Sequence, residues 1–88
     1  MPEDPRRLEH LLELREQAFA EMAAVELQFG RLRVRVERME SDLRIGLPES
    51  PDYQPTKGRL LPQAEARLIE LFSELLKLED KIKVEKGL

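Results

Sequence analysis

The sequence predicts an all-α fold in which a long helix, a loop rich in proline and glycine, and a shorter second helix form an antiparallel, coiled-coil-like hairpin. Two stretches of the 88 residues carry apolar side chains at heptad spacing, and the cluster of helix-breaking residues lies between them. Hydrophobic residues make up 41% of the chain, which is enough apolar surface to argue against a disordered protein.

The first helix is expected over about residues 5–45. Asp4 and Pro5 suit an N-cap followed by the first helical position. With Leu8 taken as heptad position a, ten of the eleven a and d positions are apolar, and Arg15 is the exception. These positions are Leu8, Leu11, Arg15, Ala18, Met22, Val25, Phe29, Leu32, Val36, Met39 and Leu43. A continuous helix of this length would extend for about 60 Å.

Gly30 allows an alternative interpretation, in which the long helix is broken in its middle. Glycine in a helix costs about 1 kcal/mol relative to alanine. The residues from Leu32 to Val36 alternate in the manner of a strand, so the helix could break at Gly30. The chain offers no second strand to pair with them, and the heptad phase runs unbroken across the glycine. We therefore expect a continuous helix.

Residues 46–61 are expected to form a loop, because Gly46 suits a helix C-cap and three prolines and a glycine follow. The second helix is expected over about residues 62–86, with Pro62 in its first turn and Gly87 at its end. Seven of its residues form a second apolar seam, namely Leu61, Ala64, Leu68, Leu71, Leu75, Leu78 and Ile82. Three further apolar residues, Ile69, Phe72 and Leu76, widen the apolar surface beyond that seam.

Helix length suggests that the hairpin is incomplete on its own. If the second helix folds back directly from residue 46, it reaches only residues 18–21, so the first four turns of the long helix would overhang. The second helix is also apolar on more than one face, whereas one neighbouring helix covers a narrow seam. We therefore expect self-association or an obligate protein partner. The expected contact residues are Leu8, Leu11, Leu12, Leu14, Met22, Val25, Phe29, Leu68, Ile69, Leu71, Phe72, Leu75 and Leu76.

Charge is distributed unevenly along the chain. Residues 1–30 hold seven acidic and three basic residues, for a net charge of −4, whereas residues 31–61 hold five acidic and seven basic residues, for +2. In an antiparallel pair of long helices the acidic end lies near the basic end, so charge favours an antiparallel dimer that closes a four-helix bundle. A ring of hairpins joined head to tail remains the alternative.

Motifs for catalysis or cofactor binding are missing from the sequence. There is no cysteine, no phosphate-binding glycine loop, and no nucleophile with a matching base. The single histidine, His10, falls at an outward heptad position, and a weak metal site with Glu9 or Glu13 is the less favoured interpretation. We expect a non-catalytic protein with no cofactor, no metal and no small-molecule substrate. A secretion signal and an apolar membrane span are not visible, so we expect a cytoplasmic protein.

A second functional hypothesis rests on basic residues. Arg31, Arg35 and Arg38 share one side of the long helix, and Lys57 and Arg59 in the loop could approach them. Such a group could contact phosphates in an accessory subunit that binds nucleic acid. The aromatic residues that stack on bases are almost missing, because Tyr53 is the only aromatic in the loop.

The helix–loop–helix pattern of residues 18–86 is similar to the oligomerisation hairpin of phage terminase small subunits. The resemblance implies an oligomer that acts in DNA packaging. The helix-turn-helix that often precedes that hairpin has no counterpart here, so the DNA-binding part of the role is not implied. The favoured function is that of a non-catalytic assembly or adaptor protein that works through oligomerisation or through binding a partner helix.

Overall fold

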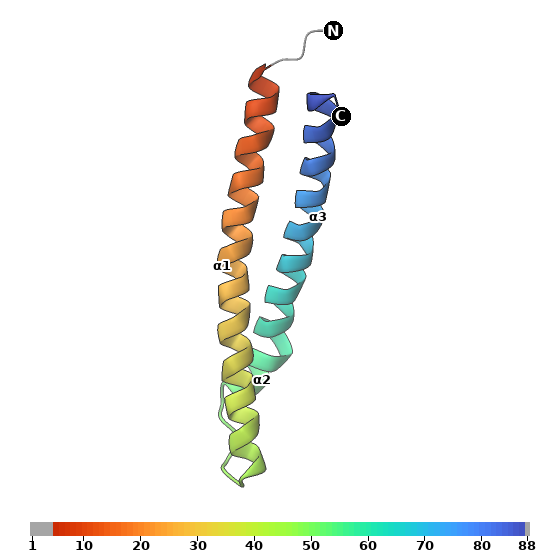
Figure 1. Cartoon of the computed structure of the whole chain (residues 1–88). Helices are drawn as coiled ribbons and strands as arrows, with labels where there is room; N and C mark the ends of the chain where they lie inside the picture. Colours follow the sequence, from red (N-terminus) through yellow and green to blue (C-terminus); the bar gives the residue numbers. More distant parts are fainter. Residues whose placement is uncertain (1–4, 88) are drawn as a thin grey trace.

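The computed structural model describes residues 5–87 and shows an antiparallel helical hairpin (Figure 1). Helix α1 (Pro5–Arg44) and helix α3 (Leu61–Lys86) lie side by side, and the start of α1 and the end of α3 lie at the same end of the molecule. No strand occurs between residues 5 and 87. These features confirm the expected all-α hairpin. The proposed N-cap, Asp4, lies outside the described residues.

Helix α1 continues through Gly30, so the alternative of a break at that residue is wrong. The helix ends at a Schellman motif, in which the Leu47 N–H donates to the Asp42 carbonyl at 3.0 Å and the Gly46 N–H to the Leu43 carbonyl at 3.1 Å. Gly46 adopts a φ of 89°, which a residue with a side chain rarely adopts. The expected role of Gly46 as the C-cap glycine is thus confirmed.

The connection between the helices differs from the expected loop over residues 46–61. A short helical turn, α2 (Tyr53–Pro55), is followed by a π-helical turn, η1 (Thr56–Leu60), which leads directly into α3. Pro62 has no N–H to donate and its ring crowds the preceding turn, so the helix widens there. The Leu61 N–H accordingly donates to the Thr56 carbonyl, five residues back. Pro55 fits the first turn, where an N–H has no helical partner.

Both heptad seams meet in the core of the hairpin. In α1 all a and d positions are buried or half-buried, and the four buried residues are Leu11, Ala18, Leu32 and Val36. In α3 all seven seam positions are likewise covered, and Leu71 is completely inaccessible to solvent. Ion pairs between Arg7 and Glu85 (3.0 Å) and between Arg15 and Glu79 (3.3 Å) cross the seam. They define the antiparallel register.

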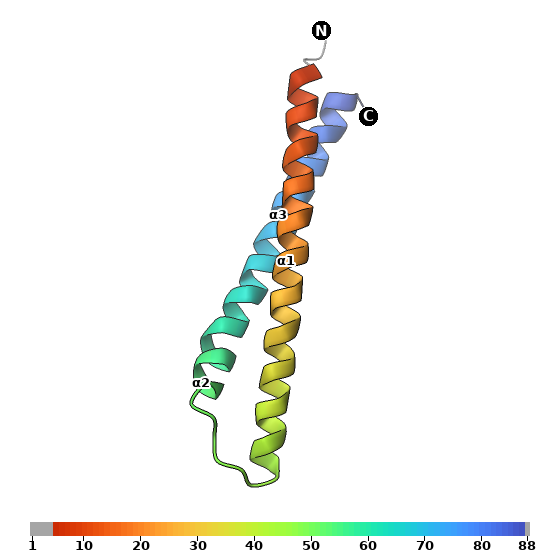
Figure 2. The ribbon, with the colours of Figure 1, turned by 90° about the vertical axis from the view of Figure 1, so that its left-hand side faces the viewer.

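The expected overhang of the first turns of α1 is wrong. Glu85, near the end of α3, reaches Arg7, and Leu11 is only 8% exposed. The reason is that α3 does not begin at the level of residue 46. The linker first runs back along α1, so that Asp52 meets Arg35 and Lys57 meets Glu40 (Figure 2). The part of α1 left without a helical neighbour is therefore its C-terminal end.

The hairpin is long and thin. The described residues extend over 69 × 17 × 14 Å, with a radius of gyration of 19.5 Å. A compact domain of this length would have a radius of gyration of about 12 Å. Two crossing helices (Figure 2) bury one seam and leave the remaining helix surface open to solvent. None of the described helices is both long and apolar enough to cross a membrane.

Candidate assembly interface

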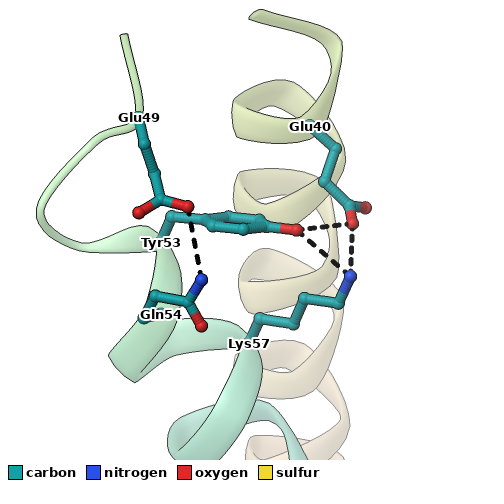
Figure 3. A network of polar contacts seen from close by, with 5 residues as sticks. All are labelled: Glu40, Glu49, Tyr53, Gln54 and Lys57. Carbon is teal, nitrogen blue, oxygen red and sulfur yellow. Dashed lines mark hydrogen bonds and ion pairs between the residues drawn. The ribbon is translucent and has the colours of Figure 1, made fainter. Parts of the chain in front are cut away.

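A polar network fixes the linker against α1 (Figure 3). The Tyr53 hydroxyl donates to Glu40 Oε2 at 2.9 Å. Lys57 Nζ donates to the same oxygen at 2.6 Å and to the Tyr53 hydroxyl at 3.1 Å. The Tyr53 ring is buried, and the ammonium group lies 5.5 Å from its centroid. This network determines where α3 starts and hence which residues the two helices leave exposed.

The network shifts the pKa of both of its charged groups. The hydrogen bond from Lys57, followed by that from Tyr53, lowers the pKa of Glu40 below its ordinary value of 4.5. The hydrogen bond to Glu40, followed by that to Tyr53, raises the pKa of Lys57 to about 12. Both groups therefore keep their charges over a wide pH range, which suits a structural role in holding the linker.

The residues expected to contact a partner fall into three groups. Leu11, Leu71 and Leu75 are buried in the seam and are unavailable to another chain while the hairpin is intact. The half-buried group consists of Leu8, Leu12, Leu14, Met22, Val25, Phe29 and Leu68. Ile69, Phe72 and Leu76 are exposed. The exposed group, with the half-buried residues beside it, is the part that can serve as a contact surface.

One side of the hairpin carries a lateral apolar patch, which we define as Phe19, Met22, Ile69, Phe72 and Leu76. Phe19, Ile69, Phe72 and Leu76 are each more than half exposed. Met22 of α1 and Ile69 and Phe72 of α3 line one shallow groove between the helices. Phe19 lies one turn before Met22 on α1, and Leu76 lies one turn after Phe72 on α3, so both extend the same side. Exposed apolar surface shared by two elements is typical of an interface.

A second exposed surface is the outer face of α1, which we define as heptad positions b, c and f from Glu9 to Arg38. Every residue at these positions is exposed. Leu27, near its centre, and Val34, among the arginines toward its C-terminal end, are 58% and 65% exposed. They line a surface groove of about 590 Å³ together with Gly30 and three arginines. This face points away from α3, because it lies opposite the a and d seam.

The five basic residues of the nucleic-acid hypothesis have different surroundings. Arg31, Arg35 and Arg38 line the groove on the outer face of α1 together. Arg35 also pairs with Asp52 at 3.2 Å, and Lys57 pairs with Glu40. Arg59 is exposed on η1. Two of the five bases thus hold the linker in place.

His10 is exposed on the outer face of α1, where the sequence places it. Among residues 5–87, no three side chains of the metal-binding types His, Cys, Asp and Glu gather in one place. Neither observation adds support to the metal site with Glu9 or Glu13.

Comparison with known proteins places the chain in no family. No family model, no curated protein and no solved structure matches it. The similarity of residues 18–86 to the terminase hairpin therefore depends on the helix–loop–helix pattern alone.

Sequence reasoning did not single out Phe19, Leu27 and Val34 as surface residues. The signal was present, because these apolar residues occupy positions e and f of the long helix, outside the a and d seam. Ala20, Ala23, Ala24 and Gly30 at neighbouring outward positions make that side of the helix unusually poor in charge at its centre. A search for apolar residues at outward heptad positions would have found this face.

Proposed function

We propose that the protein is a non-catalytic assembly module whose copies associate through the lateral apolar patch. The observation that carries the proposal is the exposure of Phe19, Ile69, Phe72 and Leu76 on one side of a hairpin that has no closed core. Small scaffolds of this size commonly reach stability by oligomerisation. A second hairpin laid against the patch would convert two helices into a four-helix bundle.

The surroundings of the patch suit this arrangement. The ion pair between Arg15 and Glu79 lies toward the chain ends, and Arg33 lies toward the linker, 5.9 Å from the centroid of the Phe29 ring. Charged groups at the edges and aromatic or aliphatic groups at the centre are the usual anatomy of a protein interface. An antiparallel arrangement of two copies places the four exposed residues of each patch against those of the other.

The test is the mass in solution of a variant with Ile69→Ser and Phe72→Ser, measured by light scattering after size exclusion. Both side chains are exposed, so the hairpin should fold, and circular dichroism checks its helix content. We expect this patch variant to have a lower mass than the native protein. A matched control with Leu47→Ser and Val84→Ser, which are exposed outside the patch, should keep the native mass.

The result that contradicts the proposal is a patch variant with the native mass and native helix content. That outcome would mean that the exposed side of α3 takes no part in association.

A further inference from the structure

The outer face of α1 changes charge along its length. Its N-terminal part carries Glu9, Glu13 and Glu16, and its C-terminal part carries Arg31 and Arg38 together with Glu37, which pairs with Arg33 of the same helix. Between them lie Ala20, Ala23, Ala24 and the large, exposed Leu27, whereas the exposed Val34 lies between Arg31 and Arg38. Within residues 5–87, the side chains of Glu9, Glu16, Arg31 and Arg38 form no ion pair with another part of the chain. Four charges and an apolar centre are therefore available to a partner.

These charges are arranged symmetrically along the helix. The midpoint between Glu16 and Arg31 falls between Ala23 and Ala24, and the midpoint between Glu9 and Arg38 falls at the same place. With a rise of 1.5 Å per residue, the inner charges lie about 11 Å from this midpoint and the outer charges about 22 Å. Glu9 and Glu16 thus each have a basic counterpart at the same distance on the other side, whereas the counterpart of Glu13 is Val34.

We propose that two copies of this chain pair antiparallel through the outer face of α1, about a twofold axis that passes between Ala23 and Ala24. In this register Glu16 of one copy lies level with Arg31 of the other, and Glu9 lies level with Arg38. The twofold axis repeats each ion pair, as an isologous interface requires. Parallel pairing in register would instead place like charges together, which is unfavourable.

Several of the remaining outward residues fit the same register, whereas Glu13 lies level with Val34 and gains no ion pair. Leu27 lies level with Ala20 of the other copy, so a large side chain meets a small one. His10 lies level with Glu37, which adds a polar pair near each end of the contact. Gly30 supports a close approach, because no atom lies within 4 Å of the position that its Cβ would occupy. Nothing within the chain requires a glycine there, whereas a second helix packed closely on this face would benefit from one.

This pairing rests on the proposed function in that copies associate, but it uses a different surface. The test is therefore made in the patch variant, Ile69→Ser with Phe72→Ser, in which the lateral contact is weakened. One derivative adds Arg31→Glu and Arg38→Glu, so that its outer face is acidic throughout. A second adds Glu9→Arg and Glu16→Arg, so that all four of the facing positions 9, 16, 31 and 38 are basic. A control adds Lys77→Glu and Lys81→Glu, which make the charge change of the first derivative at exposed positions of α3.

We expect the patch variant and the control to have about twice the mass of the 10.3 kDa chain. Each charge-reversed derivative alone should be monomeric, with a dissociation constant raised at least about tenfold, because the pairs 9/38 and 16/31 then join like charges. An equimolar mixture of the two derivatives should recover the dimer, because every facing pair is again of opposite sign. Recovery by mixing separates ion pairing from a folding defect.

Three results would overturn the pairing: a patch variant that is monomeric, charge-reversed derivatives that stay dimeric, or a mixture that stays monomeric. Failure of the proposed function gives a different result, because a patch variant then keeps the native mass. The charge reversals test the outer face in either case.

Discussion

At the scale of one residue, Gly30 lowers the stability of the helix, and the proposed packing of a second copy gives a reason for a glycine at this position. It lies in the middle of α1, and a side chain there would meet open space. In the hairpin without a partner on this face, we expect Gly30→Ala to increase the free energy of unfolding by about 0.5–1 kcal/mol, because alanine loses less backbone freedom when the helix forms. Urea unfolding followed by circular dichroism measures the change.

Gly46 provides the matched comparison for Gly30→Ala. Its φ of 89° lies in the left-handed region, where a Cβ atom is unfavourable. Gly46→Ala should therefore destabilise the protein by about 1–2 kcal/mol. Equal effects of the two substitutions would show that the helix end is not capped as described.

Tyr53 tests the network that holds the linker. Tyr53→Phe keeps the buried ring and removes the hydrogen bond to Glu40, so we expect a loss of about 1 kcal/mol in the free energy of unfolding. The change is measured by chemical unfolding. Gln54→Ala is a suitable control, because the bond from Gln54 to Glu49 is exposed and does not reach α1.

Glu40 makes the same network sensitive to acid. Its pKa is lowered in the folded protein, so its stabilising effect is complete above the ordinary value of 4.5 and is lost as the pH falls through the lowered value. The chain has one tyrosine and no tryptophan, so tyrosine fluorescence reports on the linker alone. We expect a fluorescence transition below pH 4.5 in the native protein. The transition should be missing in Glu40→Gln, and its persistence there would assign it to another group.

At the scale of one element, α3 separates residues that hold the hairpin together from residues that contact a partner. Leu71 is completely buried, so Leu71→Ala should cost about 2–5 kcal/mol in chemical unfolding. Val84→Ala, at an exposed position of the same helix, should cost less than about 0.5 kcal/mol. Leu71→Asp and Leu75→Asp, which the sequence alone would suggest as tests of assembly, would unfold the hairpin and are unsuitable for that purpose.

The seams of both helices were predictable from the sequence, because heptad spacing alone identifies which side chains share a face. Leu32, Val36, Leu71 and Ile82 are buried where that spacing places them. The course of the linker was not predictable. Whether Pro55 and Pro62 end a helix depends on the widened turn at η1 and on the contact of Tyr53 and Lys57 with Glu40. Both are tertiary features. Because of them, the part of α1 that lacks a helical neighbour is its C-terminal end and not the N-terminal end that the sequence predicts.

At the scale of the whole molecule, the lateral apolar patch and the outer face of α1 offer two separate contacts. The outer face lies opposite α3, and the patch lies to one side of the plane that contains both helices. If each contact pairs two copies about its own twofold axis, the smallest closed assembly contains four chains. Each pair joined through the outer face would then display two lateral patches.

The mass of the native protein in solution, measured by light scattering across a range of concentrations, tests the central claim that the hairpin assembles with itself. We expect about four times the 10.3 kDa mass of the chain, with a lower mass for Ile69→Ser with Phe72→Ser. A native protein that remains a 10.3 kDa monomer at every concentration, with native helix content, would contradict it.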